Sequence, residues 1–417
     1  MWINLVERWF KELFDGRRRR GVFTSVPDLI AAIELWAAHC AVAVPPSTRS
    51  HARPLEVEPP GPAIQVLRDR LTVATQVGIN YPWVNYDWDF GEPPRGSDGK
   101  PWGVRAAWKA QLAADLKSFR DLGIFAVRWW ILGSGLAYGT DGEAPSRGPS
   151  GWTVPAVPAL PQVVVDDFSA ALRVFREANM RLVPVFTDFH MFLDAPASSD
   201  TGAGFVKGGR QQLIADATKR PQFLQRALKP LLAAAQGFVA QIYAFEVVNE
   251  PEWCVRNPGS GVPRASSPTV DLAAMLAFLR DAVAMINGAG LKSTVGFAHR
   301  NTVDAWRSIE LKVQIHQFHY YGDPATIPRH PFNPKWPLVV GEFASALHKG
   351  WPELAALEKS DPGHIVLNRL KHLAGKGYPA AFIWSAEKKP STEPGQHPVV
   401  AWTPATQRDI KTFTGRT

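Results

Sequence analysis

The sequence predicts an α/β fold, a (β/α)8 barrel of the TIM type, preceded by a short helical N-terminal extension and a Pro-rich linker. From about residue 70 onward, strand-like apolar runs alternate with helical stretches, which is typical of parallel strands joined by crossover helices. Eight such runs occur, the number that closes a barrel of this kind. A doubly wound open sheet is the alternative, but no glycine-rich phosphate turn follows the first run, so we favour closure.

The predicted strands are short segments rich in β-branched and aromatic residues. In chain order they are 72–80, 124–130, 181–188, 242–249, 292–298, 313–320, 338–343 and 380–385. Between several of them, apolar residues recur three and four positions apart, which indicates helices. These predicted helices are 106–123, 166–179, 221–238, 269–288 and, at the end of the chain, 403–413.

The N-terminal region has a different pattern. Residues 2–14 and 26–39 have the apolar spacing of two helices, separated by a basic turn. The next segment is dense in proline, which cannot continue a helix. We therefore divide the chain into a helical segment 1–45, a Pro-rich linker 46–62 and a barrel domain 63–417.

Composition favours a soluble globular protein. Apolar residues make up 46% of the 417 residues, enough for a full-sized core. The most apolar stretch, 29–44, is shorter than the roughly 20 residues of a membrane-spanning helix and carries Glu34 and His39. We expect no membrane segment and no signal peptide. By default we assign the protein to the cytoplasm, as a monomer.

Charge and cysteine content exclude two further classes. The formal charge is +8, yet acidic residues are interleaved with basic ones nearly everywhere, so the charge does not predict nucleic-acid binding. We interpret the one basic cluster, Arg17–Arg20, as a solvated turn. Two cysteines, Cys40 and Cys254, make no disulfide framework and no zinc-site spacing. We expect no metal or other cofactor, and a buried, inert thiol at Cys254.

Polar residues at the strand ends are the candidates for a functional site, because the active site of a (β/α)8 barrel lies at the C-terminal ends of its strands. The residues selected in this way are Arg128, Asp188, His190, Asn249, Glu250, His319, Tyr321, Glu342 and Trp384. In a strand, side chains two positions apart share a face. The pairs expected to do so are His319 with Tyr321, Asp188 with His190, and Val340 with Glu342, whereas His316 turns away.

Glu250 and Glu342 have the positions that glycoside hydrolysis with retention requires. One carboxylate attacks the anomeric carbon while another protonates the departing oxygen, at a carboxyl separation of about 5 Å. As the acid, Glu250 needs a pKa raised by burial and by the opposing carboxylate. Glu342 must stay ionised, and we expect Arg128 and the Tyr321 hydroxyl to hold it so.

Other residues have expected supporting roles. Asn249 can donate a hydrogen bond to a sugar 2-hydroxyl, and Trp384 offers an apolar platform for a sugar ring. Asp188 is expected to orient or cap rather than to act as an acid, and His299 to be a satisfied loop histidine. Among the remaining tryptophans, we expect sugar platforms at Trp83, Trp88 and Trp253, and a helix-facing side chain at Trp129.

Six short motifs together resemble glycoside hydrolase clan A, and most closely family 5, the cellulase and mannanase type. They are AFEVVNEPEW, QFHYY, LVVGEFA and FIWS, with VRWW and TDFH upstream, and the resemblance covers roughly residues 70–415. In that family an Asn-Glu pair ends strand four and supplies the acid/base, which implies this role for Glu250. The glutamate that ends strand seven is the nucleophile, which implies Glu342. The resemblance also implies substrate binding by Arg128, His190, Asn249, His319, Tyr321 and Trp384.

The resemblance implies a retaining β-glycoside hydrolase that acts by double displacement, without a cofactor, on a β-linked glycoside or polysaccharide of mannan or glucan type. The segment GINYPWVNYDWDFG at 78–91 is longer and more aromatic than in the cellulases and mannanases, which leaves the sugar open. A transglycosylase and a carbohydrate-binding pseudoenzyme are the alternatives. Binding alone does not need both glutamates together with Asn249, His319 and Tyr321, which argues against the pseudoenzyme.

The first 45 residues resemble the C-terminal end of insertion-sequence transposases of the DDE type related to mariner. The matching text is WINLVERWFKEL followed by RRRRGVFTSVPDLIAAIELWAAH. In those enzymes the glutamate that corresponds to Glu7 is the third metal-binding acid. One carboxylate alone cannot hold a two-metal site. We interpret this segment as an inactive remnant of an insertion or gene fusion. DNA binding through it, or a fusion product without function, are the less favoured alternatives.

Overall fold

A computed structural model shows how the chain folds. The structure describes residues 75–82, 88–91, 108–139, 144–148, 151–195, 206–308, 310–323, 326–330, 337–345, 361, 363–387 and 402–416. All of them belong to one compact unit, Ala74–His330 with Trp336–Thr417. The predicted helical segment 1–45 and the linker 46–62, and with them Arg17–Arg20 and Cys40, lie outside the described residues.

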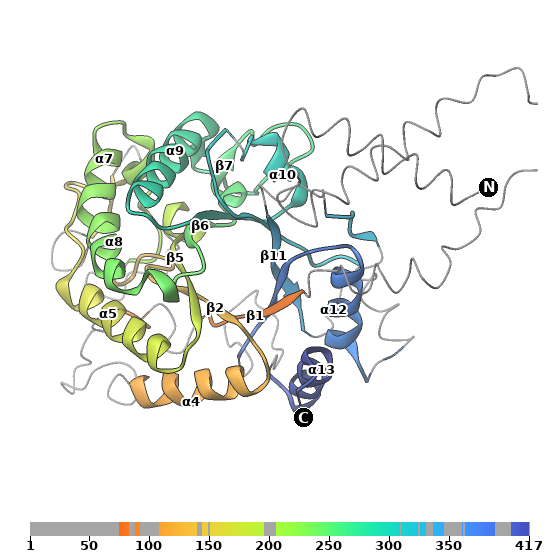
Figure 1. Cartoon of the computed structure of the whole chain (residues 1–417). Coiled ribbons are helices and arrows are strands. Elements are labelled where there is room, and N and C mark those ends of the chain that lie inside the picture. The colour runs from red at the N-terminus through yellow and green to blue at the C-terminus, as the bar shows by residue number, and fades with distance from the viewer. Residues whose placement is uncertain are drawn as a thin grey trace, which may run out of the picture. The chain divides into compact units, whose positions relative to one another are not determined.

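Eight parallel strands close into a barrel (Figure 1). They are β1 (Gln76–Asn80), β2 (Ala126–Trp130), β5 (Arg181–Asp188), β6 (Phe245–Asn249), β9 (Ser293–Phe297), β10 (His316–His319), β11 (Leu338–Ala344) and β12 (Ala380–Trp384). Each strand pairs with the next in this order, and β12 closes the ring on β1. All eight predicted strands are confirmed, with ends that differ by a few residues. The closed order excludes the doubly wound open sheet.

Helices surround the strands and connect them (Figure 1). They include α4 (Trp108–Asp121), α5 (Gln162–Glu177), α6 (Gln212–Ala215), α9 (Leu272–Gly288), α10 (Arg300–Ala305), α12 (Ile365–Gly375) and α13 (Pro404–Thr414). In α5 the buried residues Val164, Phe168, Leu172 and Phe175 recur three and four positions apart, so one stripe of the helix packs inward. In the described part of the chain, no helix has both the length and the apolar character needed to cross a bilayer.

The predicted helix at 221–238 is correct in place but is not continuous. It is divided into α7 (Lys219–Phe223), the π-turn η5 (Leu224–Leu228), α8 (Lys229–Ala235) and the 3-10 turn η6 (Gln236–Gln241). Pro230 accounts for the interruption, because it has no N–H for the carbonyl of Arg226 and its ring crowds that turn. Apolar spacing, on which the prediction rests, carries no information about this change of winding.

The interior of the barrel has an apolar floor and a polar layer nearer the C-terminal ends of the strands. The floor consists of Ala126, Val183, Ala244, Ile315, Val339, Ala380 and Phe382. Two residues further along their strands, Arg128 and Gln317 donate hydrogen bonds to the carboxylate of Glu246. Gly296 makes room for this layer, since a Cβ there would lie 2.2 Å from Oε1 of Glu246. The polar layer therefore supports the strand ends from below.

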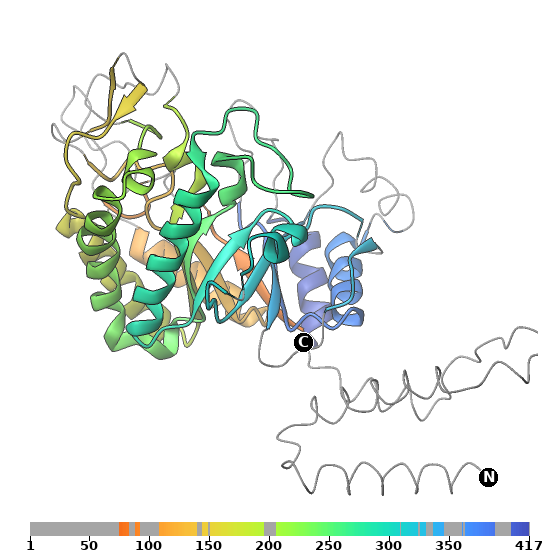
Figure 2. The ribbon, with the colours of Figure 1, turned by 90° about the horizontal axis from the view of Figure 1, so that it is seen from above.

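Two small sheets in the loops were absent from the predicted elements. Strand β3 (Ser146–Gly148) pairs antiparallel with β4 (Gly151–Thr153), and β7 (Val255–Arg256) pairs parallel with β8 (Val270–Asp271). In Figure 2 the β3–β4 hairpin (yellow) stands beyond the ends of the helices, at one end of the barrel. Both sheets lie in connections that follow strand ends, and they stabilise the loops on the side where the candidate residues gather.

Candidate active site

Glu250 and Glu342 come together at the mouth of the barrel. Glu250 directly follows β6, and Glu342 lies on β11, with β9 and β10 between these strands. One oxygen of each carboxylate and one imidazole nitrogen of His319 all lie within 4.8 Å of one another. Nδ1 of His319 is 2.8 Å from Oε1 of Glu250 and 3.4 Å from Oε2 of Glu342. The structure thus brings the two predicted carboxylates and the predicted histidine into one cluster.

Glu250 combines an unusual backbone with a raised pKa. Its φ of 46° and ψ of 50° lie in the left-handed region, which is costly for a residue with a Cβ. Its Oε2 accepts a hydrogen bond of 3.0 Å from the indole N–H of Trp253, in the 3-10 turn η7 (Pro251–Cys254). Burial, and after it the negative charge of Asp188, raises the pKa of Glu250 to about 7. Burial acts as expected, but the second contribution comes from Asp188 rather than from the opposing Glu342.

Glu342 is held on both oxygens. Arg128 donates from Nη1 to Oε1 at 2.6 Å, and the hydroxyl of Tyr321 donates to Oε2 at 2.5 Å. Burial, and with it the negative charge of Glu250, leaves the pKa of Glu342 raised, although His319, Arg128 and the Tyr321 hydroxyl each lower it in part. Both partners expected from the sequence therefore contact this carboxylate and stabilise its ionised form.

Irregular strand pairing turns Glu342 and Asn249 toward the mouth. Val340 belongs to the core between the strands and the helices, and regular alternation would turn Glu342 to the same side. The pairing of β11 with β12 shifts between Val340 and Phe343, and the pairing of β6 with β9 shifts between Glu246 and Asn249. The expectation that Val340 and Glu342 share a face is wrong, because it assumes a regular strand and the ladder is not regular here.

Arg128 is buried beneath the mouth and its hydrogen-bonding capacity is filled. Its guanidinium makes five hydrogen bonds: two to Glu246 and one each to Asn80, Glu342 and Asn249. A guanidinium has five N–H groups, so no donor remains for a substrate. The expected substrate contact by Arg128 does not fit this arrangement, in which the side chain positions Glu342 and Asn249 instead.

Three residues of this network are missing from the sequence-based candidates: Asn80, Glu246 and Gln317. Glu246 and Gln317 lie within their strands, so the selection of strand-end residues passes over them. Asn80 is the last residue of β1, and the selection omits it although it lies at a strand end. Glu246 is fully buried, and a charged residue inside an apolar strand segment such as AFEVVN is the signal that points to it, since such residues are rarely buried unpaired.

Asp188 orients Asn249 and caps a turn. Its Oδ2 accepts from the amide of Asn249 at 2.7 Å, and its Oδ1 accepts from the backbone N–H of His190 at 2.9 Å. These contacts are those of an orienting and capping residue. His190 lies on the 3-10 turn η3 (Phe189–Phe192) rather than on a strand, so strand alternation does not explain its position. Its imidazole is 52% exposed and contacts Asp188 through Nδ1 at 2.5 Å.

The tryptophans divide between the mouth and the core. Trp384 ends β12, is half-buried, and meets the ring of Trp130 edge-on at 5.7 Å between centroids. The guanidinium of Arg128 in turn lies over the ring of Trp130, with 4.4 Å between Cζ and the ring centroid. Trp129 is buried and donates to Asp89 at 2.7 Å, away from the pocket as expected. Of the expected platforms, Trp253 contacts Glu250, Trp88 packs against the main core, and Trp83 lies outside the described residues.

His316, Cys254 and His299 are the other side chains whose surroundings are expected from the sequence. His316 turns away from the mouth as expected, with Nδ1 2.7 Å from the hydroxyl of Ser308. Cys254 is buried, also as expected. His299 differs, because its buried Nε2 has no hydrogen-bond partner among the described residues. The expected satisfied loop histidine is therefore wrong, and His299 instead lines a cavity next to the carboxylates.

Glu250, His319 and Glu342 also have the spacing of metal ligands. However, Oε1 of Glu342 lies 2.6 Å from the guanidinium of Arg128, and Oε2 already accepts from Tyr321. A fixed positive charge next to the cluster opposes the binding of a divalent cation. The donor set therefore favours a pair of carboxyl groups without a metal ion over a metal centre.

Comparison by sequence finds no matching protein-family model and no matching curated protein. Many solved structures are similar in fold, among them three mannanases. An endo-1,4-β-mannanase from Eisenia fetida has a TM-score of 0.55 at 20% identity, over 82% of this chain and 92% of that one. A β-mannanase from the blue mussel Mytilus edulis has a TM-score of 0.54 at 18% identity, over 82% and 92%. A β-1,4-mannanase from the sea hare Aplysia kurodai has a TM-score of 0.52 at 19% identity, over 78% and 95%. At these identities the likeness extends to the fold, a (β/α)8 barrel.

Proposed function

We propose that this protein is a retaining β-glycoside hydrolase, with Glu250 as general acid/base and Glu342 as nucleophile. The observation that carries the proposal is the distance between the two carboxylates, which approach within 4.8 Å across the mouth of a closed barrel. Retaining glycosidases hold their two carboxyl groups about 5–5.5 Å apart, whereas inverting enzymes need about 6.5–9.5 Å to admit a water molecule. The separation supports direct attack by a carboxylate.

In the first step, Glu342 attacks the anomeric carbon while Glu250 gives its proton to the glycosidic oxygen. The bond to the leaving sugar breaks and an ester forms between the anomeric carbon and Glu342. A pKa of about 7 keeps much of Glu250 protonated near neutral pH. The hydrogen bonds from Arg128 and Tyr321 favour the ionised nucleophile.

In the second step, Glu250 acts as a base. It takes a proton from a water molecule, whose oxygen attacks the anomeric carbon and releases Glu342 as a carboxylate. Two inversions at the same carbon leave its configuration unchanged. A sugar hydroxyl in place of water gives transglycosylation with the same residues, so both reactions share one site.

The surrounding residues bind the sugar whose anomeric carbon reacts. The amide nitrogen of Asn249 donates one hydrogen to Asp188. Its second hydrogen has no acceptor among the described residues and can bind a sugar 2-hydroxyl, a contact that strengthens in the transition state. The half-buried face of Trp384 suits the apolar face of a pyranose. His190 and His319 complete the polar lining. Arg128 acts through Glu342 and Asn249 and does not touch the substrate.

A β-mannan or a β-glucan is the proposed substrate. The motifs that resemble glycoside hydrolase family 5 are those of the cellulase and mannanase type, and the three similar structures above are named β-mannanases. Mannans therefore come first in any panel. The carbohydrate-binding pseudoenzyme is disfavoured by Glu250, because a raised pKa and a strained backbone are features that binding alone does not need.

The test is sugar release by the full-length protein from β-mannans, β-glucans, xylan and aryl β-glycosides. Glu342→Gln is run in parallel, with Glu310→Gln, an exposed residue on the surface, as the matched control. We expect release from at least one mannan or glucan, a loss of more than a thousandfold in Glu342→Gln, and no change in Glu310→Gln. Equal activity in wild type and Glu342→Gln would contradict the proposed nucleophile.

A further inference from the structure

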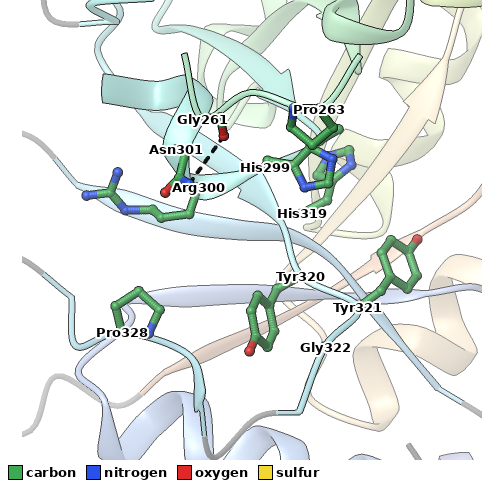
Figure 3. A pocket seen from close by; sticks show the side chains of 11 residues that line it. Gly261, Pro263, His299, Arg300, Asn301, His319, Tyr320, Tyr321, Gly322 and Pro328 are labelled. Carbon is green, nitrogen blue, oxygen red and sulfur yellow. Dashed lines mark hydrogen bonds between the residues drawn. The ribbon is translucent and has the colours of Figure 1, made fainter. Parts of the chain in front are cut away.

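A cavity of about 370 Å³ lies next to the carboxylate pair. The ends of β9 and β10 and the loops that follow them contribute His299, Arg300, His319, Tyr321 and Pro328 to its lining, and the loop between β7 and β8 contributes Pro263 (Figure 3). This volume falls within the range of small-molecule sites, about 300–1,000 Å³. The cavity shares His319 and Tyr321 with the proposed active site, so a ligand bound there lies next to the reacting atoms.

Two imidazole nitrogens in this lining lack a partner. Nε2 of His299 and Nε2 of His319 are both buried and make no hydrogen bond to any described residue. Burial lowers the pKa of both histidines, that of His319 to about 4, so both rings are neutral at pH 7. A buried polar atom without a partner costs free energy, and such atoms in native proteins usually have a functional reason. A ligand hydroxyl is a partner that can accept from or donate to either nitrogen.

The cavity lies on the leaving-group side of the acid. His319 contacts Oε1 of Glu250 directly. His299 packs edge-on against Trp253, with 5.4 Å between the ring centroids, and the indole N–H of Trp253 donates to Oε2 of Glu250. The side chain of Asn249 points the other way, toward Asp188 and Arg128 on β5 and β2. If Asn249 holds the 2-hydroxyl of the sugar under attack, that sugar lies over β5 and β2. The sugar that receives the proton of Glu250 then extends toward β9 and β10.

The lining favours a neutral sugar over an acidic one. Arg300 pairs with Asp304 at 2.7 Å, and Figure 3 shows its side chain extending away from the two imidazoles. Near the carboxylates the cavity offers uncharged imidazoles and a phenol. Pro263, Pro328 and the ring of Tyr320 add apolar surface, which suits the C–H faces of a pyranose.

We propose that this cavity binds the leaving-group sugar, a neutral pyranose, and that His299 is the residue that recognises its hydroxyls. The inference rests on the proposed function, because it takes Glu250 as the proton donor. His299 thereby has a specificity-determining role, although none of the strand-end motifs contains it. By microscopic reversibility, the same cavity accepts the sugar hydroxyl that resolves the glycosyl-enzyme in transglycosylation.

The experiment compares two substrates of the full-length protein. A β-glycosyl fluoride places one atom on the leaving-group side and leaves the cavity empty, whereas a β-linked oligosaccharide of the same sugar fills it. We expect His299→Ala to raise KM for the oligosaccharide by roughly tenfold, the effect of one lost hydrogen bond, and to affect the fluoride several-fold less. His299→Gln, which keeps a donor and an acceptor, restores part of the loss. His372→Ala, on the exposed side of α12, is the matched control and leaves both rates unchanged.

Equal losses on both substrates, or no loss on either, would overturn the assignment of the cavity. Failure of the proposed function has a different signature, because wild type then releases no fluoride from any donor. In that case binding is read directly from the imidazole nitrogen shifts of His299 on addition of methyl β-mannoside and methyl β-glucoside. A change in the chemical shift of Nε2 of His299 supports a sugar site without hydrolysis. No change at 100 mM of each probe overturns the proposal, because roughly that dissociation constant is the weakest of use to a binding site.

Discussion

Arg128 and Glu246 form a bidentate ion pair inside the barrel, with Nε and Nη2 of the arginine each 2.6 Å from a different carboxylate oxygen. Both side chains are fully buried. The pair fixes the guanidinium so that Nη1 points at Glu342, which connects the interior of the barrel to the proposed nucleophile. A planar, forked cation is required here, because one side chain serves four acceptor residues at once.

Removal of this cation is expected to destabilise the fold. Arg128→Met leaves the carboxylate of Glu246 buried without its partner, which costs about 3–5 kcal/mol. The free energy of unfolding, measured by urea denaturation, should fall by that amount. Arg120→Met, on the exposed surface of α4, changes it by less than about 0.5 kcal/mol. A loss of under about 1 kcal/mol in Arg128→Met would mean that the ion pair does not stabilise the barrel.

The Tyr321 hydroxyl is expected to tune the nucleophile. Burial raises the pKa of Glu342, and the hydrogen bond from Tyr321 is among the contacts that lower it. In Tyr321→Phe the pKa of Glu342 therefore rises, and the acidic limb of the kcat/KM profile moves to higher pH. Loss of a hydrogen bond to a charged group also lowers kcat/KM by about 10- to 100-fold.

The matched control is Tyr138→Phe, which removes a buried hydroxyl that donates to the carbonyl of Pro158. Its pH profile should be that of wild type. An acidic limb in Tyr321→Phe that stays in place, with a lower plateau, would show that the hydroxyl positions Glu342 without affecting its charge.

Asp188 is expected to set the alkaline limb. Burial first, and then the charge of Asp188, raises the pKa of Glu250 to about 7. The acid acts only while protonated, so activity falls as pH rises through that value. Asp188→Asn removes the negative charge, lowers the pKa of Glu250, and moves the alkaline limb of kcat/KM to lower pH. Asp281→Asn, an exposed aspartate on α9, leaves the limb in place, and a shift to higher pH in Asp188→Asn would contradict the assignment of Glu250.

Glu252 is expected to make stability depend on pH. Its carboxylate is fully buried and accepts the backbone N–H groups of Ala298 and His299, and burial raises its pKa to about 7. Between the unfolded value near 4.3 and the folded value, the native state binds more protons, so stability falls as pH rises through this window. In Glu252→Gln the slope of unfolding free energy against pH between about 5 and 7 should be shallower than in wild type. An unchanged slope would mean that Glu252 is ionised throughout this range.

Much of the fold follows from the sequence because each barrel strand is a short apolar run between helical stretches. Runs such as AVRWW and FEVVN are buried whatever the register of their pairing with neighbouring strands. The positions of these strands along the chain can therefore be predicted without knowledge of the register. The interruption at Pro230 and the small sheets β3–β4 and β7–β8 depend on backbone winding and on two- or three-residue pairings. These carry too few residues for a periodic signal.

The candidate site follows from the sequence in part. Selection of strand ends finds Glu250, Glu342, His319 and Tyr321, since these positions converge in any closed parallel barrel. It misses Glu246, which lies one layer deeper. Strand alternation, in turn, gives the wrong face for Val340, since a shift in ladder register has no mark in the sequence. Whether a loop histidine such as His299 has a partner depends on contacts between distant loops.

Covalent trapping of the nucleophile is the most direct test of the proposed mechanism. The full-length protein is incubated with activated 2-deoxy-2-fluoro-β-glycosides of the manno and gluco series, which form the glycosyl-enzyme but slow its hydrolysis. We expect a mass increase of one fluoroglycosyl group, located by peptide mapping at Glu342 and absent in Glu342→Gln. A label on any other residue, or hydrolysis of a natural substrate with inversion at the anomeric carbon, would contradict it.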